Sequence, residues 1–173
     1  RLYVGFADGT LAALNLEEGL LLFEVKLSTG IKFVDLDNPI SVIDGKIFAG
    51  VMGGPLHIIN ADNGAIIKRS DIISSRNPYQ EGDELLIPMP NGTIVRTDKN
   101  LNILSEKKLF KGAISDFKEN PSTGSYFVAS TNGEIAELEK RTLEVKRSKH
   151  LGHSYSAVFG EVDINQKSIA LLS

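Results

Sequence analysis

The stretch GFADGTLAALNLEEG, residues 5–19, is an apolar run broken at Asp8-Gly9, followed by an alternating run that stops at Glu18-Gly19. Pairs such as Asp-Gly favour tight hairpin turns because glycine reaches positive φ without a steric cost. The aliphatic residues of the second run fall on one face of an extended strand. The stretch is therefore predicted to form a β-hairpin that ends in a second turn.

The same pattern returns three more times, in IFAGVMGGPLHIIN, LLIPMPNGTIVRTD and YFVASTNGEIAELE. Each copy has a turn glycine, an aliphatic residue two positions later, and an asparagine or acidic residue six positions later. The glycines are Gly9, Gly54, Gly92 and Gly133, which are 45, 38 and 41 residues apart; the aliphatic residues are Leu11, Leu56, Ile94 and Ile135; the polar residues are Asn15, Asn60, Asp98 and Glu139. Such column agreement indicates an internal repeat.

Each repeat also holds a third run, such as LLLFEVKL or EVKRSKHL, and copies two to four are preceded by a further short segment, such as NPISVIDG. Four short strands in about forty residues are typical of a propeller blade. A β-sandwich would also have short strands, but it does not require the same turn residues at a near-constant interval. No stretch has a helical period. The predicted fold class is all-β, a β-propeller of four-stranded antiparallel blades.

The expected blades are residues 1–30, 31–73, 74–111 and 112–152, with a partial blade at 153–173, all within one propeller region, 1–173. About four blades, with open pieces at both ends, fit half of a larger ring. The chain is then either a piece of that ring or a module whose copies join into one. Because unpaired strand edges promote association, we expect self-association through the open blade edges.

Composition excludes several classes of function. The net charge is −3 without a basic stripe, which argues against a nucleic-acid partner. There is no cysteine for disulfide or thiolate chemistry. No run approaches the ~18 apolar residues of a membrane span, and no signal peptide is recognisable.

Residues 34–67, VDLDNPISVIDGKIFAGVMGGPLHIINADNGAII, resemble a blade of the BamB family of outer-membrane assembly lipoproteins, which belongs to the PQQ-like repeat propellers. The shared features are the V-D-x-D-x-P lead-in, the Asp-Gly turn, the G-x-L-x-x-(I/L)-(N/D) strand and the closing glycine. Residues 3–19 follow the same template, and the likeness is in outline only beyond residue 70.

This resemblance implies a periplasmic, outer-membrane-associated propeller that supports BamA, the protein that assembles outer-membrane barrels. It implies a contact with BamA's POTRA domains through an L-D-L-R stretch, whose matching positions here are Ile59, Asn60, Ala61 and Asp62. Asp62 stands where the family has arginine, and a carboxylate cannot act as a guanidinium fork. The lipidated cysteine of the family has no counterpart in this sequence.

PQQ-dependent enzymes share the repeat, but their blades carry a closing tryptophan, and here those positions hold Phe23, Lys68, Glu106 and Arg147. Neither a quinone cofactor nor any other is therefore expected. The spacing of His150 and His153 supplies too few ligands for zinc, and His57 alternates with apolar strand residues as a packing residue does.

Two further groups of polar residues could carry chemistry. Asp35 and Asp37 lie on one face of an extended segment without the oxygen ligands of a calcium loop, and a turn into the next strand explains them. Ser154 and Ser156 lack a nucleophile elbow. We therefore expect no catalytic or metal site and a non-enzymatic scaffold for protein partners. A ligand-binding, ion-binding or quinoprotein-like use of the central channel, and a self-assembling module, are the alternatives.

Overall fold

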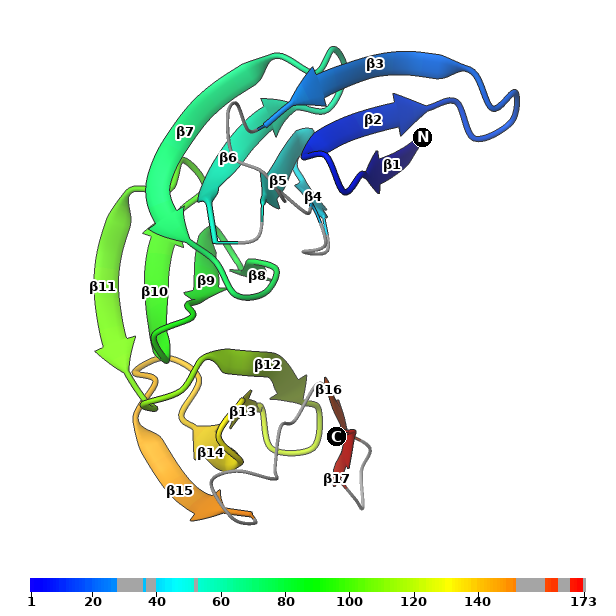
Figure 1. Cartoon of the computed structure of the whole chain (residues 1–173). Helices are drawn as coiled ribbons and strands as arrows, with labels where there is room; N and C mark the ends of the chain where they lie inside the picture. The colour runs from blue at the N-terminus through cyan, green and yellow to red at the C-terminus, as the bar shows by residue number, and fades with distance from the viewer. Residues whose placement is uncertain (28–35, 37–39, 52, 152–160, 165–168, 173) are drawn as a thin grey trace. The chain divides into compact units, whose positions relative to one another are not determined.

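The computed structural model describes residues 1–27, 36, 40–51, 53–151, 161–164 and 169–172. These residues form seventeen β-strands and no helix. Figure 1 shows the strands along the chain. The described part of the chain accordingly offers no helical segment able to cross a membrane. The all-β class is confirmed.

The strands form antiparallel sheets that follow the order of the sequence. The first sheet contains β1 (Leu2–Gly5), β2 (Thr10–Leu14) and β3 (Leu21–Lys26). The second contains β4 (Ser41–Ile43), β5 (Lys46–Gly50), β6 (Pro55–Asn60) and β7 (Ile66–Ile73). The third contains β8 (Tyr79–Glu81), β9 (Glu84–Pro88), β10 (Thr93–Asp98) and β11 (Ile103–Lys108). The fourth contains β12 (Ile114–Asn120), β13 (Ser125–Ser130), β14 (Glu134–Leu138) and β15 (Val145–His150), and β16 (Glu161–Ile164) pairs with β17 (Ile169–Leu172).

The chain divides into two compact units, and the third sheet contributes to both. One unit comprises Arg1–Ile87 with Thr97–Asn102, and the other comprises Pro88–Arg96 with Ile103–Ser173.

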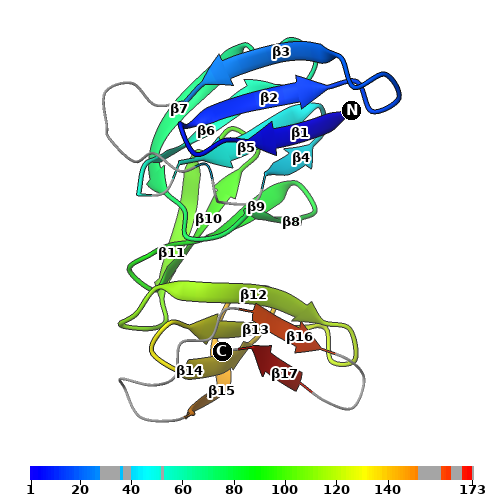
Figure 2. The ribbon, with the colours of Figure 1, turned by 45° about the vertical axis from the view of Figure 1, so that its right-hand side comes forward.

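In the first unit, the first and second sheets pack face to face, as Figure 2 shows. Leu11 of β2 meets Ile47 and Ile59 of β5 and β6, all three without solvent exposure. Partly buried Tyr3, Phe23 and Val25 complete the contact from the first sheet. Burying each large aliphatic side chain contributes about 1.5–3 kcal/mol, so this contact is a main source of stability in the unit.

In the second unit, Tyr126 of β13 is fully buried and its ring centroid lies 4.5 Å from that of Phe117 on β12. Lys140 covers the Tyr126 ring at 5.7 Å and pairs with Glu119 at 2.8 Å. The strand β16 contacts β12. The aromatic pair therefore anchors β12 and β13 to each other, and a lysine shields it from solvent.

The first turn of each repeat contains a left-handed glycine, and in three of the four repeats it is the predicted one. Gly9, Gly92 and Gly133 have φ of 79°, 82° and 79°. The second repeat differs, because Gly53 (φ 69°) takes the left-handed conformation there rather than Gly54.

The second turn of each repeat is closed by the polar residue six positions after the turn glycine. We call these the capped turns: Asn15–Gly19, Asn60–Gly64, Asp98–Asn102 and Glu139–Leu143. Asn60 Oδ1, for example, accepts hydrogen bonds from the backbone N–H of Asp62 (2.8 Å) and Asn63 (3.2 Å). In the last turn, bonds from the Thr142 hydroxyl and N–H lower the pKa of Glu139 to about 2.

The capped turns need a left-handed residue near their end. Gly19 and Gly64 supply it with φ of 69° and 75°, but Leu101 and Leu143 adopt it with φ of 59° and 57°. Both leucines are buried, at 4% and 3% exposure. Burial of a large side chain thus outweighs the about 1–2 kcal/mol that this backbone conformation costs.

Candidate functional site

The four residues predicted to bind a partner lie at the end of β6 and in the capped turn that follows. Ile59 and Ala61 are buried, Asn60 is half-buried, and the Asp62 side chain is exposed. Ile59 and Ala61 belong to the core between the first and second sheets. The surface they could offer to a partner is therefore made by Asn60 and Asp62.

The first sheet holds this turn in place. Arg1 donates to the carbonyl of Ala61 and to the Asp62 carboxylate, both at 2.7 Å, and the Tyr3 hydroxyl donates to the same carbonyl at 3.0 Å. A Cβ atom at Gly64 would lie 2.4 Å from the Phe23 ring. The turn is therefore docked against the preceding sheet by polar groups at one end and by close packing at the other.

The next capped turn is docked in the same way against the second sheet. Lys68 Nζ donates to the carbonyl of Asn100 (2.6 Å) and to Asn102 Oδ1 (3.1 Å), and Lys46 Nζ donates to Asn100 Oδ1 at 3.0 Å. Lys99 pairs in return with Asp44 at 2.5 Å.

In the second unit, Arg96 of β10 donates to the carbonyls of Lys140 (3.3 Å) and Arg141 (3.1 Å) in the fourth sheet's turn. Three successive junctions thus share one chemistry, in which a cationic side chain of one sheet binds turn carbonyls of the next. The cationic residue stands at a different position of the repeat in each junction, so the sequence alone does not reveal the shared contact.

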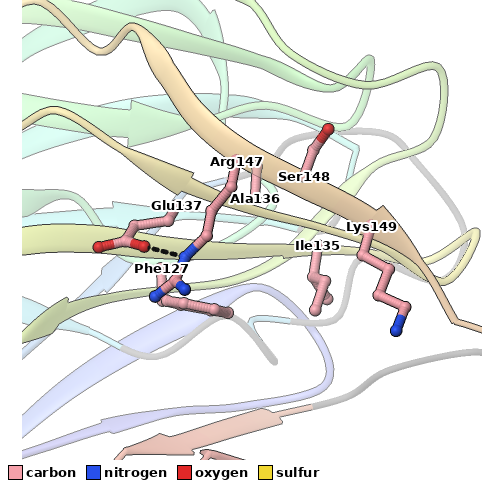
Figure 3. A pocket seen from close by; sticks show the side chains of 7 residues that line it. All are labelled: Phe127, Ile135, Ala136, Glu137, Arg147, Ser148 and Lys149. Carbon is pink, nitrogen blue, oxygen red and sulfur yellow. Dashed lines mark hydrogen bonds and ion pairs between the residues drawn. The ribbon is translucent and has the colours of Figure 1, made fainter.

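The fourth sheet carries a pocket of about 310 Å³ on the face formed by β13, β14 and β15. Figure 3 shows Phe127, Ile135, Glu137, Arg147 and Lys149 around it. Strand pairing places Glu137 opposite both Phe127 and Arg147, and Ile135 opposite Lys149. The lining combines the apolar side chains of Phe127 and Ile135 with the charged side chains of Glu137, Arg147 and Lys149.

Glu137 is the buried charge of this pocket, at 5% exposure. Its carboxylate accepts hydrogen bonds from the Ser125 hydroxyl at 2.5 Å and the Thr123 hydroxyl at 3.4 Å, and it pairs with Arg147 Nε. These donors, Ser125 first, hold the pKa of Glu137 below its ordinary value against the opposing effect of burial. The Arg147 side chain is 72% exposed, so it stays accessible from solvent while it pairs with Glu137.

His57, expected to be a packing residue, is buried at 1% exposure in β6. His150 is exposed at the end of β15. His153, Asp35, Asp37, Ser154 and Ser156 lie outside the described residues. Among the residues that are described, no group of three metal-ligating side chains occurs.

Sequence reasoning did not identify the group formed by Ser125, Glu137 and Arg147. A signal for it was present, because alternation puts Ile135 and Glu137 on one face of β14 and Arg147 and Lys149 on one face of β15. Arg147 also occupies the column of Phe23 and Lys68, both of which touch the next sheet's capped turn. The sequence does not reveal the pairing register that brings β14 and β15 together.

No protein-family model matches the chain, and no curated protein matches it. Solved structures do resemble it. BamB from Moraxella catarrhalis has a TM-score of 0.71 at 16% identity, with 99% of this chain and 51% of that chain covered. The computationally designed Ika8 protein has a TM-score of 0.74 at 14% identity, covering 98% and 51%, and Saccharomyces cerevisiae Sqt1 has 0.74 at 18%, covering 98% and 51%. The chain spans about half the length of each of these structures, and at these identities the likeness shows the fold, a β-propeller of antiparallel blades.

Proposed function

We propose that this chain is a non-catalytic scaffold that binds protein partners through its capped turns. The observation that carries this proposal is the construction of those turns. Each is closed by its own polar residue, and those of the second, third and fourth sheets are also held by a cationic side chain of the sheet before. A rigid turn that presents exposed polar side chains loses little conformational entropy when a partner binds.

The second sheet's turn is the first candidate contact. Asp62 and Asn63 are exposed, whereas the backbone beneath them is fixed by Asn60, Arg1 and Tyr3. The carboxylate of Asp62 favours a partner surface that presents lysine or arginine, because opposite charges steer association and fix register.

The resemblance of residues 34–67 to BamB blades, together with the fold likeness, supports a finer proposal. The chain would act in the periplasm at the outer membrane, as a support for a BamA-like protein whose POTRA domains it binds. Self-association of the propeller is part of the same proposal.

The test is a titration of a BamA POTRA fragment against the whole chain by calorimetry. We expect binding, and we expect Asp62→Ala with Asn63→Ala to weaken it by at least about fivefold, or about 1 kcal/mol. Absence of binding at concentrations up to about 1 mM would overturn the proposed partner.

The matched control is Asp83→Ala. Asp83 is an exposed aspartate that, like Asp62, makes one surface ion pair, in this case with Lys99 at 3.1 Å. It lies outside the capped turns, so this variant should bind the POTRA fragment as the unmodified chain does. Equal weakening by both substitutions would argue for general electrostatic attraction rather than a contact at the turn.

A further inference from the structure

Three turns of the chain contain an asparagine followed by a glycine. The pairs are Asn63-Gly64, Asn91-Gly92 and Asn132-Gly133. All three asparagines are exposed. Because glycine has no Cβ atom, its backbone nitrogen can be approached closely by the side chain that precedes it. Each asparagine is therefore placed next to a backbone nitrogen with which its side-chain amide can react.

The backbone nitrogen is engaged alike in the three pairs. Each glycine N–H donates to a carbonyl of the residue that opens its turn, and the distances are 2.9 Å for Gly64, 3.0 Å for Gly92 and 3.1 Å for Gly133. This hydrogen bond has to open before the nitrogen can react. Since it is common to all three pairs, it does not favour one of them over another.

The asparagine side chains are held differently. Through their Oδ1 atoms, Asn63 and Asn91 each accept a hydrogen bond at 3.0 Å from the N–H two residues later. The Asn132 side chain forms no hydrogen bond with any residue that the structure describes. Its amide lies over Gly112, where an added Cβ would be 2.6 Å from Asn132 Cγ. Of the three amides, that of Asn132 is thus the one without a hydrogen bond to fix its orientation.

Ser130 accounts for this difference. Its Oγ accepts the Glu134 N–H at 3.2 Å, the group that corresponds to the Thr93 N–H bound by Asn91 in the third repeat. The same Oγ accepts the Asn132 N–H at 3.2 Å. The other repeats have no hydroxyl at this position, which is occupied by Phe6, Val51 and Met89. The serine therefore takes the donor that would otherwise hold the asparagine side chain.

We propose that Asn132 is the preferred site of spontaneous deamidation among the three Asn-Gly pairs. The Gly133 nitrogen forms a bond to Cγ of Asn132, and its proton passes through water to the departing Nδ2, which leaves as ammonia. Water then opens the cyclic imide at either carbonyl and gives aspartate or its β-linked isomer. The side-chain amide has to turn its face towards the glycine nitrogen, and in the other two pairs this breaks a hydrogen bond.

The modification changes the turn between β13 and β14. The aspartate product adds a negative charge and resembles the first repeat, where Asp8 occupies this position and accepts the Thr10 N–H at 3.0 Å. The β-linked product lengthens the backbone by a methylene group just before Gly133, whose carbonyl accepts the Leu151 N–H at 2.8 Å. It therefore disturbs the attachment of the segment that follows β15. This inference goes beyond the proposed function and does not rest on it.

The test is to age the folded chain at neutral pH in water enriched in heavy oxygen and to locate the incorporated label by peptide mass spectrometry. We expect residue 132 to react about fivefold faster than Asn63 and Asn91, which corresponds to about 1 kcal/mol, the contribution of a single hydrogen bond. If either of the other two asparagines converts as fast as Asn132, the proposal is overturned.

Replacing the serine tests the cause. Ser130→Ala leaves the Glu134 N–H to Asn132 Oδ1, so the rate at Asn132 should fall to that at Asn91. The matched control is Thr131→Val, which removes a neighbouring hydroxyl to which no described residue is hydrogen-bonded, and the rate should not change. No fall in Ser130→Ala, or an equal fall in both variants, would contradict the proposal.

The reverse exchange is made in the third repeat. Met89→Ser places a hydroxyl where it can take the Thr93 N–H, so the rate at Asn91 should rise about fivefold. Met89→Ala controls for the loss of the methionine side chain and should leave that rate unchanged. Asn63 is the internal reference in every sample. If Met89→Ala has the same effect as Met89→Ser, or if Asn63 accelerates as much as Asn91, the hydroxyl does not control the reaction and the proposal fails.

Discussion

At the scale of single residues, His57 shows how burial changes acid–base behaviour. Its imidazole lies in β6 at 1% exposure, opposite Arg69 on β7. Burial, and then the charge of Arg69, lower the pKa of His57 from its ordinary 6.5. The backbone groups of Pro55 and Ala49 act in the other direction by a smaller amount.

This predicts a loss of stability in mild acid. Below pH 6.5 the unfolded chain takes up a proton that folded His57 does not, so the free energy of unfolding falls as the pH is lowered. The slope approaches about 1.4 kcal/mol per pH unit between the two pKa values. Urea denaturation across the range of about pH 5 to 7 should show a shallower pH dependence for His57→Gln. His150→Gln, at an exposed histidine, is the control and should keep the original slope.

Leu143 is a second residue-scale case, because it combines a left-handed φ of 57° with burial. At an ordinary position glycine is about 1 kcal/mol less stable than alanine. Here Leu143→Ala loses the side chain and keeps the backbone strain, whereas Leu143→Gly loses the side chain and relieves it. We therefore expect both variants to be destabilised by about 1–4 kcal/mol, with alanine the worse of the two, as measured by thermal unfolding.

Leu138 is the control for the relative stability of the alanine and glycine variants. It is fully buried in β14, where the backbone is extended. Its alanine variant should be more stable than its glycine variant. If Leu143 shows that same order, its φ does not limit stability.

At the scale of one element, the capped turns share one backbone conformation but pack against different neighbours. Gly19 and Gly64 have φ of 69° and 75°, but only Gly64 faces a ring, that of Phe23, at 2.4 Å from its ideal Cβ. An ideal Cβ at Gly19 would meet no atom within 4 Å. Gly19→Ala should therefore cost about 1–2 kcal/mol from backbone strain alone, and Gly64→Ala at least about 1 kcal/mol more from the displaced ring.

A double-mutant cycle with Phe23→Leu isolates the ring contact. The extra cost of Gly64→Ala should shrink in the Phe23→Leu background, whereas the cost of Gly19→Ala should not change. Additive effects at Gly64 and Phe23 would show that the turn is not packed against β3 as described.

At the scale of the whole molecule, the first sheet displays more apolar surface than a covered sheet does. Leu16, Leu20, Leu21 and Leu22 are all about half exposed or more, at 70%, 59%, 55% and 45%. We expect dilute protein to bind the dye ANS, which reports exposed apolar surface. Leu16→Asp should lower this fluorescence, whereas Asp83→Ala, at an exposed polar residue, should leave it unchanged.

Much of the fold followed from the sequence because the signals were local. Glycine at Gly9, Gly92 and Gly133 is required by a positive φ, and a strand such as Lys46–Gly50 is apolar because it is buried on both faces. The repeat interval then distinguished a propeller from a sandwich. The left-handed Leu101 and Leu143 could not be anticipated, because backbone preference alone disfavours leucine there and only burial compensates.

The amino-acid sequence alone was sufficient to predict the repeat, the hairpins and the all-β class. Each of these depends on φ preferences and on alternation within a few residues. Tertiary structure decided which strand faces are covered, that Ile59 and Ala61 lie in a junction between sheets, and that Arg147 meets Glu137. Alternation tells that a strand has two faces but not which neighbour covers them. A long cationic side chain binds whichever oxygen the packing of distant segments brings within its reach.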